Sequence, residues 1–327
     1  MAQNTTVEIS IKGKWYKVSG LDVNGYTIIA RGTWLRVAFL NAEEWLTTEL
    51  DNPEVCLERL RKPSAHGLRA DIFTFAQKLP ATLPKYSYPM EWESVAAVHV
   101  TSFKDWWEKL PQEGRKNVRR SQKRGVVVKV KQLDEELVRE IVEVNDDSPL
   151  RQRRPYAHYG KTCDEVRKDQ STFRDRCDFI CAYLGTELIG FLKLVYRREI
   201  ASILQFLPKA SRYDVRPANA LIAKAVELCE AKALSYLTYG KYHYGNQGAT
   251  SLNEFKTRNG FEELFLPRYY IPLTLKGRIG MTLNLHHGFM GLFPRSVIRL
   301  GSRMRSEWYN RRFSTGRCSS MAERPKL

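Results

Sequence analysis

The chain has 327 residues, 43% of them hydrophobic, which allows two domains and an ordinary globular core. It has no apolar run of about 18 residues and no basic N-terminal stretch followed by an apolar core, which argues against a membrane-spanning helix and a secretory signal peptide. The net charge of +17 stands against 36 acidic residues and indicates an anionic partner: nucleic acid, anionic lipid or a phosphorylated substrate.

Cysteine and histidine are scattered, with six of each along the chain. No C-x-x-C pair and no His/Cys cluster with metal-ligand spacing is present. We therefore predict reduced thiols, a cytoplasmic location and no bound metal.

The N-terminal part, residues 1–66, is predicted to be a small β-rich accessory unit. Segments 7–11 and 15–18 resemble one hairpin, and 26–30 and 34–40 resemble another. Segments 43–49 and 53–61 have helical character. Residues 67–125 are predicted to be a linking region, with strands at 71–75 and 95–100 and a basic helix at 112–124 that ends at Gly125.

The most regular patterns lie between residues 126 and 275, which we predict to be the main domain. Strands are expected at 126–130, 178–184, 187–195, 201–207, 234–239 and 261–272. Helices are expected at 134–144, 217–231 and 251–258. The region 276–313 mixes apolar residues with arginine and is expected either to pack on this domain or to lie on an anionic membrane. Residues 314–327 have no periodicity and are expected to be a disordered tail.

Three antiparallel strands followed by strand–helix alternations are typical of the GNAT acyltransferases. The segments 115–125, 216–222 and 251–261, the last reading Ser-Leu-x-x-Phe-Lys-x-x-x-Gly-Phe, resemble the FemAB branch, which includes BioF2-like acetyltransferase domains and aminoacyl-tRNA-dependent transferases. The resemblance covers about residues 102–272. It implies an α/β (α+β) fold with a mixed, mostly antiparallel sheet flanked by helices. It also implies transfer of an acyl or aminoacyl group from a thioester or tRNA ester to an amine.

The donor is expected at the junction 207–217, before the helix at 217–231. Many acetyl-CoA enzymes of this fold have a glycine-rich loop there, and this junction has no glycine. Acetyl-CoA or another acyl-CoA is therefore disfavoured relative to aminoacyl-tRNA, and no permanently bound cofactor is expected. Arg212, Arg216 and Asn219 are the candidate donor-binding residues here.

Lys256 is the leading candidate catalytic residue, because the resemblance implies that the lysine of a Phe-Lys pair lies in the transfer site, with Phe255 beside it. A lysine can stabilise charge that develops on an attacked carbonyl. The alternative is a solvated lysine on a helix surface.

The strand end at 239–248 is the second candidate, since ligands bind at the carboxyl ends of strands in open α/β sheets. His243 is a candidate general base and Tyr244 a further catalytic candidate. The alternative is an exposed aromatic loop. The candidate binding residues of this loop are Tyr239, Lys241, Tyr242, Asn246 and Gln247.

Two basic segments are candidates for phosphate or carboxylate recognition. Arg115 and Arg119 share a face of the basic helix and are candidate tRNA contacts, unless that helix is simply solvated. Arg151, Arg154 and Tyr156 lie where the fold keeps its acceptor loop.

The sequence thus predicts a GNAT/FemAB-type N-acyltransferase related to the cell envelope. Two alternatives remain open: a catalytically inactive GNAT-like module that binds nucleic acid or anionic lipid, and an acetyltransferase for a cell-envelope glycan. A peripheral position at the inner membrane face is also open.

Overall fold

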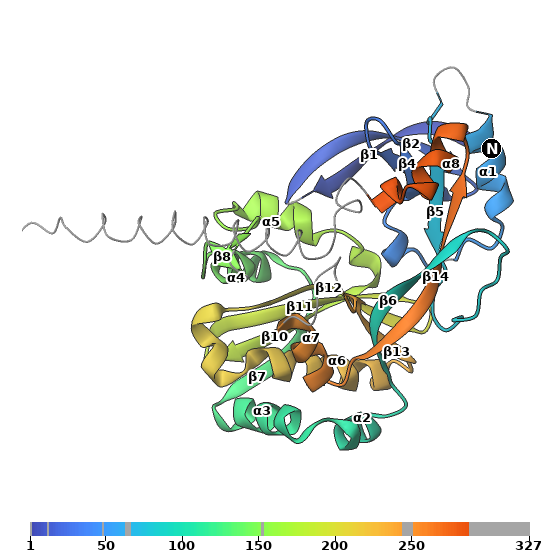
Figure 1. Cartoon of the computed structure of the whole chain (residues 1–327). Coiled ribbons are helices and arrows are strands. Elements are labelled where there is room, and N and C mark those ends of the chain that lie inside the picture. Colours follow the sequence, from blue (N-terminus) through green and yellow to red (C-terminus); the bar gives the residue numbers. More distant parts are fainter. Residues whose placement is uncertain are drawn as a thin grey trace, which may run out of the picture.

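The computed structural model describes residues 2–11, 13–47, 49–62, 67–151, 154–243 and 251–287. One twelve-stranded mixed sheet runs through this part in the order β1-β2-β3-β4-β5-β14-β6-β13-β12-β11-β10-β7 (Figure 1). Its strands are β1 (Ala2–Ile11), β2 (Lys14–Val23), β3 (Tyr26–Arg31), β4 (Val37–Leu40), β5 (Ile72–Ala76), β6 (Met90–His99), β7 (Val126–Lys131), β10 (Cys177–Leu184), β11 (Glu187–Arg197), β12 (Ile200–Pro208), β13 (Tyr236–Lys241) and β14 (Glu262–Pro272). The short strands β8 (Leu150–Arg151) and β9 (Arg154–Pro155) pair separately.

Helices cover both faces of the half of the sheet that runs from β13 to β7 (Figure 1). The α-helices are α1 (Pro53–Arg61), α2 (Phe103–Lys109), α3 (Gln112–Lys123), α4 (Glu135–Asn145), α5 (Cys163–Gln170), α6 (Pro217–Ala231), α7 (Ser251–Arg258) and α8 (Leu275–Thr282). The 3-10 helices are η1 (Glu43–Trp45), η2 (Arg174–Arg176), η3 (Ala210–Val215) and η4 (Leu285–His287).

The apolar run of β10 follows from burial on both faces. Ile180 belongs to the core that α6 and α3 cover, whereas its neighbour Phe179 belongs to the core beneath α4. Both residues are fully buried. Because successive residues of a strand point to opposite faces, a strand buried on both faces is apolar at most of its positions.

The predicted strand order of the main domain is confirmed. β10, β11 and β12 are antiparallel neighbours, and β13 pairs with β12 in parallel. Two helix ends are set by residues next to them in the sequence. Ser102 is the N-cap of α2 and accepts from the backbone N–H of Asp105, and Gly125 follows α3 with φ +81.

The position of the last strand differs from the simplest expectation. β14 does not lie beside β13, because β6, from the region predicted to link two units, is inserted between them. β14 also pairs with β5, which pairs with β4, so the β-rich N-terminal part continues the same sheet. Pairing over long sequence separations decides this arrangement.

One predicted helix was wrong and one helix was missed. The helix expected at 43–49 is only the single turn η1, and α5 was not expected. The start of α5 has a sequence signal: Thr162 and Glu165 form a capping box. Residues 288–327, which include most of the predicted C-terminal region and the predicted tail, lie outside the described residues.

Candidate active site

The strands β12 and β13 pair only near their beginnings. Residues 200–202 bond in parallel to 236–238, and after this the two strands diverge toward their carboxyl ends. β13 continues instead along β6, where Lys241 lies opposite Val95. This divergence leaves an opening in the sheet, which is where an open α/β sheet binds ligands.

A cavity of about 500 Å³ lies at this opening. The end of β12, the start of α6, the middle of β13, one face of α7 and the loop before α5 form its walls. The lining residues are Arg151, Tyr156, Phe206, Leu207, Pro208, Tyr213, Arg216, Pro217, Ala218, Asn219, Tyr239, Ser251, Leu252 and Phe255. Six of the predicted site residues are therefore brought together here: Arg151, Tyr156, Arg216, Asn219, Tyr239 and Phe255.

Two arginines enter this cavity from different parts of the chain. Arg151 donates from Nη1 to the carbonyl of Pro208 at 2.8 Å, and its guanidinium lies 5.6 Å from the ring centre of Tyr156. Within the described residues, the buried Nε atoms of Arg151 and of Arg216 have no hydrogen-bond partner. Buried donors are nearly always paired, so two unpaired guanidinium N–H groups indicate a place for an acceptor-rich ligand.

The backbone of Arg216 is unusual. This residue caps α6 with φ 58 and ψ 44, in the left-handed region, and Pro217 follows as the first helical residue. A left-handed conformation costs a residue with a side chain roughly 1–2 kcal/mol. In return, the guanidinium lies at the N-terminus of a 15-residue helix, where free N–H groups and the helix dipole favour an anion.

The other two cations of this junction, Lys209 and the predicted site residue Arg212, are already paired. Glu187, the first residue of β11, accepts from Lys209 at 2.9 Å and from Nη2 of Arg212 at 2.7 Å. Hydrogen bonds from Lys209 and Arg212 hold the pKa of the Glu187 carboxyl below its usual value. Arg212 was predicted to contact the donor; in the structure it is bonded to Glu187 and is not part of the cavity lining.

Asn219 and Phe255 act in the packing around the cavity as well as lining it. The amide of Asn219 donates to Oδ1 of Asn259 at 2.9 Å, which connects α6 to the end of α7. Phe255 packs against Phe206 with ring centres 5.6 Å apart, and Phe206 meets Tyr239 edge-on at 5.7 Å. Phe206, Tyr239 and Phe255 thus form an aromatic wall of the cavity.

Lys256 is fully buried behind this aromatic wall. Its ammonium donates to the carbonyl of Lys241 at 2.6 Å and lies 4.8 Å from the ring centre of Tyr239. Burial lowers the pKa of Lys256 to about 8. Lys256 is therefore not the solvated surface lysine that was the alternative prediction. It does not line the cavity either, because the ring of Tyr239 lies between its ammonium and the cavity.

The residues after Tyr239 turn away from the 500 Å³ cavity. Lys241 forms an ion pair with Glu93 of β6, and Tyr242 shares a 2.7 Å hydrogen bond with Thr257 of α7. The catalytic candidate Tyr244 and the binding candidates Asn246 and Gln247 lie outside the described residues.

His243, the predicted general base, is held by two neighbours. Its Nε2 lies 3.4 Å from Glu263 and its Nδ1 lies 3.1 Å from the amide of Asn253. It is not among the residues that line the cavity.

A smaller cavity of about 70 Å³ lies on the other side of β13 and is rich in charged residues. The charged members of its lining are Glu43, Glu44, Lys78, Glu93, Arg197, Lys241 and Arg268. Burial lowers the pKa of Lys78 to about 8 and that of Arg197 to about 10. Sequence reasoning missed all of these except Lys241, because they come from strands and turns far apart in the chain.

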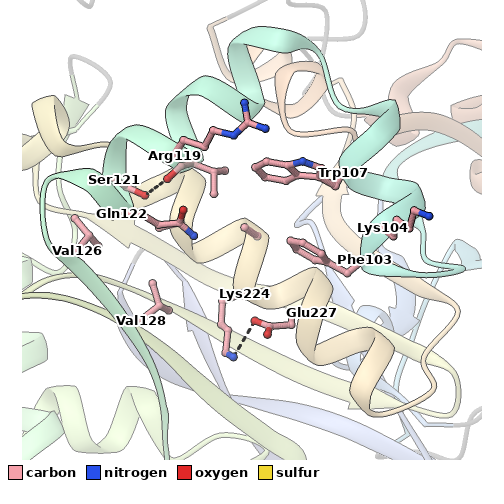
Figure 2. Close-up of a pocket in the computed structure, with 13 residues that line it drawn as sticks. Phe103, Lys104, Trp107, Arg119, Ser121, Gln122, Val126, Val128, Lys224 and Glu227 are labelled. Atoms are coloured by element: carbon pink, nitrogen blue, oxygen red, sulfur yellow. Dashed lines mark hydrogen bonds and ion pairs between the residues drawn. The ribbon is translucent and has the colours of Figure 1, made fainter.

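The basic helix α3 borders a groove of about 640 Å³ between α2 and α6 (Figure 2). Figure 2 shows Arg119 and Trp107 on its upper wall, with the guanidinium 5.5 Å from the ring centre of Trp107. Phe103 stacks on Trp107 with ring centres 5.9 Å apart. Arg115, in contrast, donates to the carbonyl of Glu108 at 3.0 Å, so it caps α2.

The predicted acceptor loop is split between cavity and solvent. Arg151 and Tyr156 line the cavity, whereas Arg154 is exposed and does not. Of the helices in the described ranges, none is long and apolar enough to cross a membrane.

Comparison with known proteins shows which solved structures have a similar fold. A scan of the sequence against protein-family models found no match, and neither did a search of curated proteins. Among solved structures, FemX is similar over 86% of this chain and 90% of its own, with a TM-score of 0.52 and 9% identity. The C-terminal domain of a lysylphosphatidylglycerol synthetase from Agrobacterium fabrum is similar over 82% of this chain and 88% of its own, with a TM-score of 0.53 and 14% identity. L-PGS from Bacillus licheniformis is similar over 81% and 85%, with a TM-score of 0.50 and 14% identity. These similarities show that the chain shares its fold with FemX and the two synthetases, which confirms the expected mixed, mostly antiparallel sheet flanked by helices.

Proposed function

We propose that the protein transfers an aminoacyl group from a tRNA ester to an amine, with the donor held in the cavity between β12 and β13. The observation that carries this proposal is the pair of unpaired Nε atoms of Arg151 and Arg216 at the opening of the sheet. Guanidinium groups beside a helix N-terminus suit the phosphates of a nucleotide-bearing donor.

The type of donor follows from the junction before α6. The segment 207–217 has no glycine, and a side-chain-bearing residue, Arg216, holds the left-handed position at the helix start. Its Cβ restricts the close backbone approach that a diphosphate makes to glycine-rich loops. A donor bound through side chains, such as the end of a tRNA, fits better than acetyl-CoA.

The reaction needs few protein groups. The amine nitrogen attacks the ester carbonyl carbon, a C–N bond forms, and the C–O bond to the donor breaks. The amine loses one proton and the departing oxygen gains one. Arg151 and Arg216 would offset negative charge near this carbon, as preorganised donors do in other acyl transfers.

Lys256 would contribute positive charge from behind the aromatic wall of the cavity. Its ammonium lies 4.8 Å from the ring of Tyr239, and this ring faces the cavity. Because Lys256 is fully buried, solvent would screen its positive charge little from charge that develops in the cavity. Lys256 would also fix the end of β13 through its bond to the carbonyl of Lys241.

Two observations support an acceptor at the cell envelope. One of the similar structures is named as a synthetase of lysylphosphatidylglycerol, a lipid that bears an aminoacyl group. On α8 and at its C-cap, the residues Leu275, Ile279 and Leu283 are exposed by 73%, 50% and 51%. Their spacing of four places them on one face, which would suit a peripheral contact with an anionic membrane.

A donor comparison tests the proposal. The full chain is incubated with a cell-envelope extract and either tRNA charged with labelled amino acids or labelled acetyl-CoA. Transfer of label from charged tRNA only is the expected result, and the product should resist mild base, because an amide is more stable than an ester. Label from acetyl-CoA alone would favour the glycan acetyltransferase, and no transfer from either donor would favour a binding module.

A further inference from the structure

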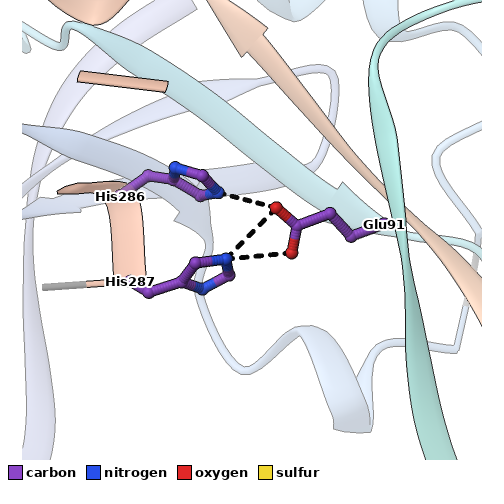
Figure 3. A group of neighbouring side chains, drawn as sticks. All are labelled: Glu91, His286 and His287. Atoms are coloured by element: carbon purple, nitrogen blue, oxygen red, sulfur yellow. Dashed lines mark hydrogen bonds and ion pairs between the residues drawn. The ribbon is translucent and has the colours of Figure 1, made fainter. Parts of the chain in front are cut away.

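A histidine pair near the end of the described chain faces a carboxylate on β6. Glu91 lies on β6, and His286 and His287 lie in η4, so the three side chains come from segments 195 residues apart (Figure 3). The Nε2 of His286 lies 2.8 Å from Oε1 of Glu91, and the Nε2 of His287 lies 2.9 Å from Oε2. One ligand atom from each residue lies within 4.8 Å of the others.

We propose that Glu91, His286 and His287 bind one Zn²⁺ ion. Two imidazole nitrogens and one carboxylate oxygen are a common three-ligand set for zinc, with water completing a tetrahedron. At bond lengths of about 2.1 Å, tetrahedral ligand atoms are ~3.4 Å apart. The two histidine–carboxylate separations, 2.8 and 2.9 Å, are shorter than this by about half an ångström, so small rotations of Glu91 and His287 admit the ion.

The burial of the three side chains supports a defined site with one open side. The side chain of His286 is only 3% exposed and packs against the ring of Tyr270, with ring centres 4.7 Å apart. The side chains of Glu91 and His287 are 42% and 43% exposed. One imidazole is therefore fixed by packing, while the other two ligands leave room for the ion to enter and for water to bind.

The chemistry also selects the kind of ion. Imidazole favours zinc and its neighbouring transition metals, whereas Mg²⁺ and Ca²⁺ prefer oxygen ligands only. In the part of the chain that the structure describes, no other group of three such side chains is gathered. The spacing of histidines in the sequence predicts no metal, and this site departs from that prediction because its third ligand is distant in the chain.

A bound ion would cross-link η4 to β6. η4 follows α8 at the end of the described chain, and β6 is the strand that pairs with both β13 and β14. An ion held by both segments would fasten residues 285–287 to a strand that pairs with β13, which contributes Tyr239 to the proposed transfer site. The ion would be structural, since none of its ligands lines the 500 Å³ cavity.

Metal titration of the full chain tests this proposal. The protein is stripped with a chelator and titrated with ZnCl₂ and, separately, MgCl₂, by isothermal calorimetry. The expected result is saturable binding of one Zn²⁺ per chain and no such binding of Mg²⁺. The substitutions Glu91→Gln, His286→Gln and His287→Gln should each weaken zinc binding by on the order of a hundredfold.

A matched control uses another histidine–carboxylate contact. His158 lies 3.2 Å from Asp169 without a second histidine beside them, so His158→Gln should bind zinc as the unchanged chain does. His287 is exposed, so His287→Gln is expected to fold normally, which circular dichroism checks. Absence of one-to-one zinc binding, or ligand variants that bind zinc as tightly as the unchanged chain, would overturn the proposal.

Discussion

The ammonium of Lys256 donates a 2.6 Å hydrogen bond to the carbonyl oxygen of Lys241, the last residue of β13. This bond joins α7 to the strand that diverges from β12, so a buried positive charge lies next to the opening of the sheet. The bond also means that a change at Lys256 affects both the charge and the position of the strand end. Predictions about this residue therefore need a control with the same burial.

Replacing Lys256 with methionine is expected to lower the turnover rate, but by less than the roughly hundredfold loss of a donor that contacts an oxyanion directly, because Lys256 does not line the cavity. Substrate binding should change little. Lys193 is the matched control, because it is also fully buried, its pKa is also lowered to about 8 by burial, and its ammonium bonds to the carbonyls of Gln170 and Thr172 instead. Lys193→Met should lose stability but keep its rate. Equal rate losses in both variants would show that Lys256 has only a structural role.

Stability should depend on pH through Lys256. Its pKa is about 8 in the folded chain, against 10.5 for the unperturbed group, so the unfolded state binds more protons between these values. The free energy of unfolding then rises with pH across this window by up to about 3 kcal/mol from this residue. Lys256→Met removes this contribution, so the stability of the variant relative to the unchanged chain should fall from pH 8 to pH 10.5. Denaturant titrations at three pH values measure it, and a difference that is constant with pH would contradict the assignment.

Arg216→Gly should separate stability from donor binding. Glycine adopts the left-handed conformation at φ 58 without strain, so the melting temperature should not fall. The loss of the guanidinium group, a charged hydrogen-bond donor, should weaken binding of aminoacyl-tRNA about tenfold or more, as measured by filter binding. Arg212→Ala is the control in the same junction, since its charge is already bonded to Glu187. A larger loss of tRNA affinity with Arg212→Ala than with Arg216→Gly would show that the donor binds elsewhere.

The groove beside α3 should contact phosphate through Arg119. Arg119→Ala is expected to weaken tRNA binding and to reduce the slope of log affinity against log salt by about one. Arg115→Ala should leave the slope unchanged and lower stability, because Arg115 caps α2 through the carbonyl of Glu108. The same slope in both variants would exclude this groove from the tRNA path.

Acetyl-CoA should not form a tight complex. The junction 207–217 lacks glycine, and the position where a backbone could meet a diphosphate has the side chain of Arg216. Calorimetry of acetyl-CoA with the full chain is expected to show no saturable heat at micromolar concentrations. A tight one-to-one complex would mean that side chains replace the glycine loop for this donor.

The sequence alone determined most of the elements. The helices at 217–231 and 251–258 have the bounds predicted from their apolar spacing and their flanking Pro217 and Gly260. The strands from 177 to 208 were visible because two-sided burial leaves an apolar run, and their order pointed to the fold. These signals are local, since periodicity, caps and turn residues act within a few positions.

The tertiary structure alone decided which of the predicted residues meet. The insertion of β6 between β13 and β14 cannot be seen in either strand, because a strand pattern specifies a buried face and not a partner. Glu187 neutralises Arg212, and the ring of Tyr239 separates Lys256 from the cavity. Glu91 and His286 come together across 195 residues. Charge pairing and burial act over distances in space, and the spacing of residues along the chain does not record them.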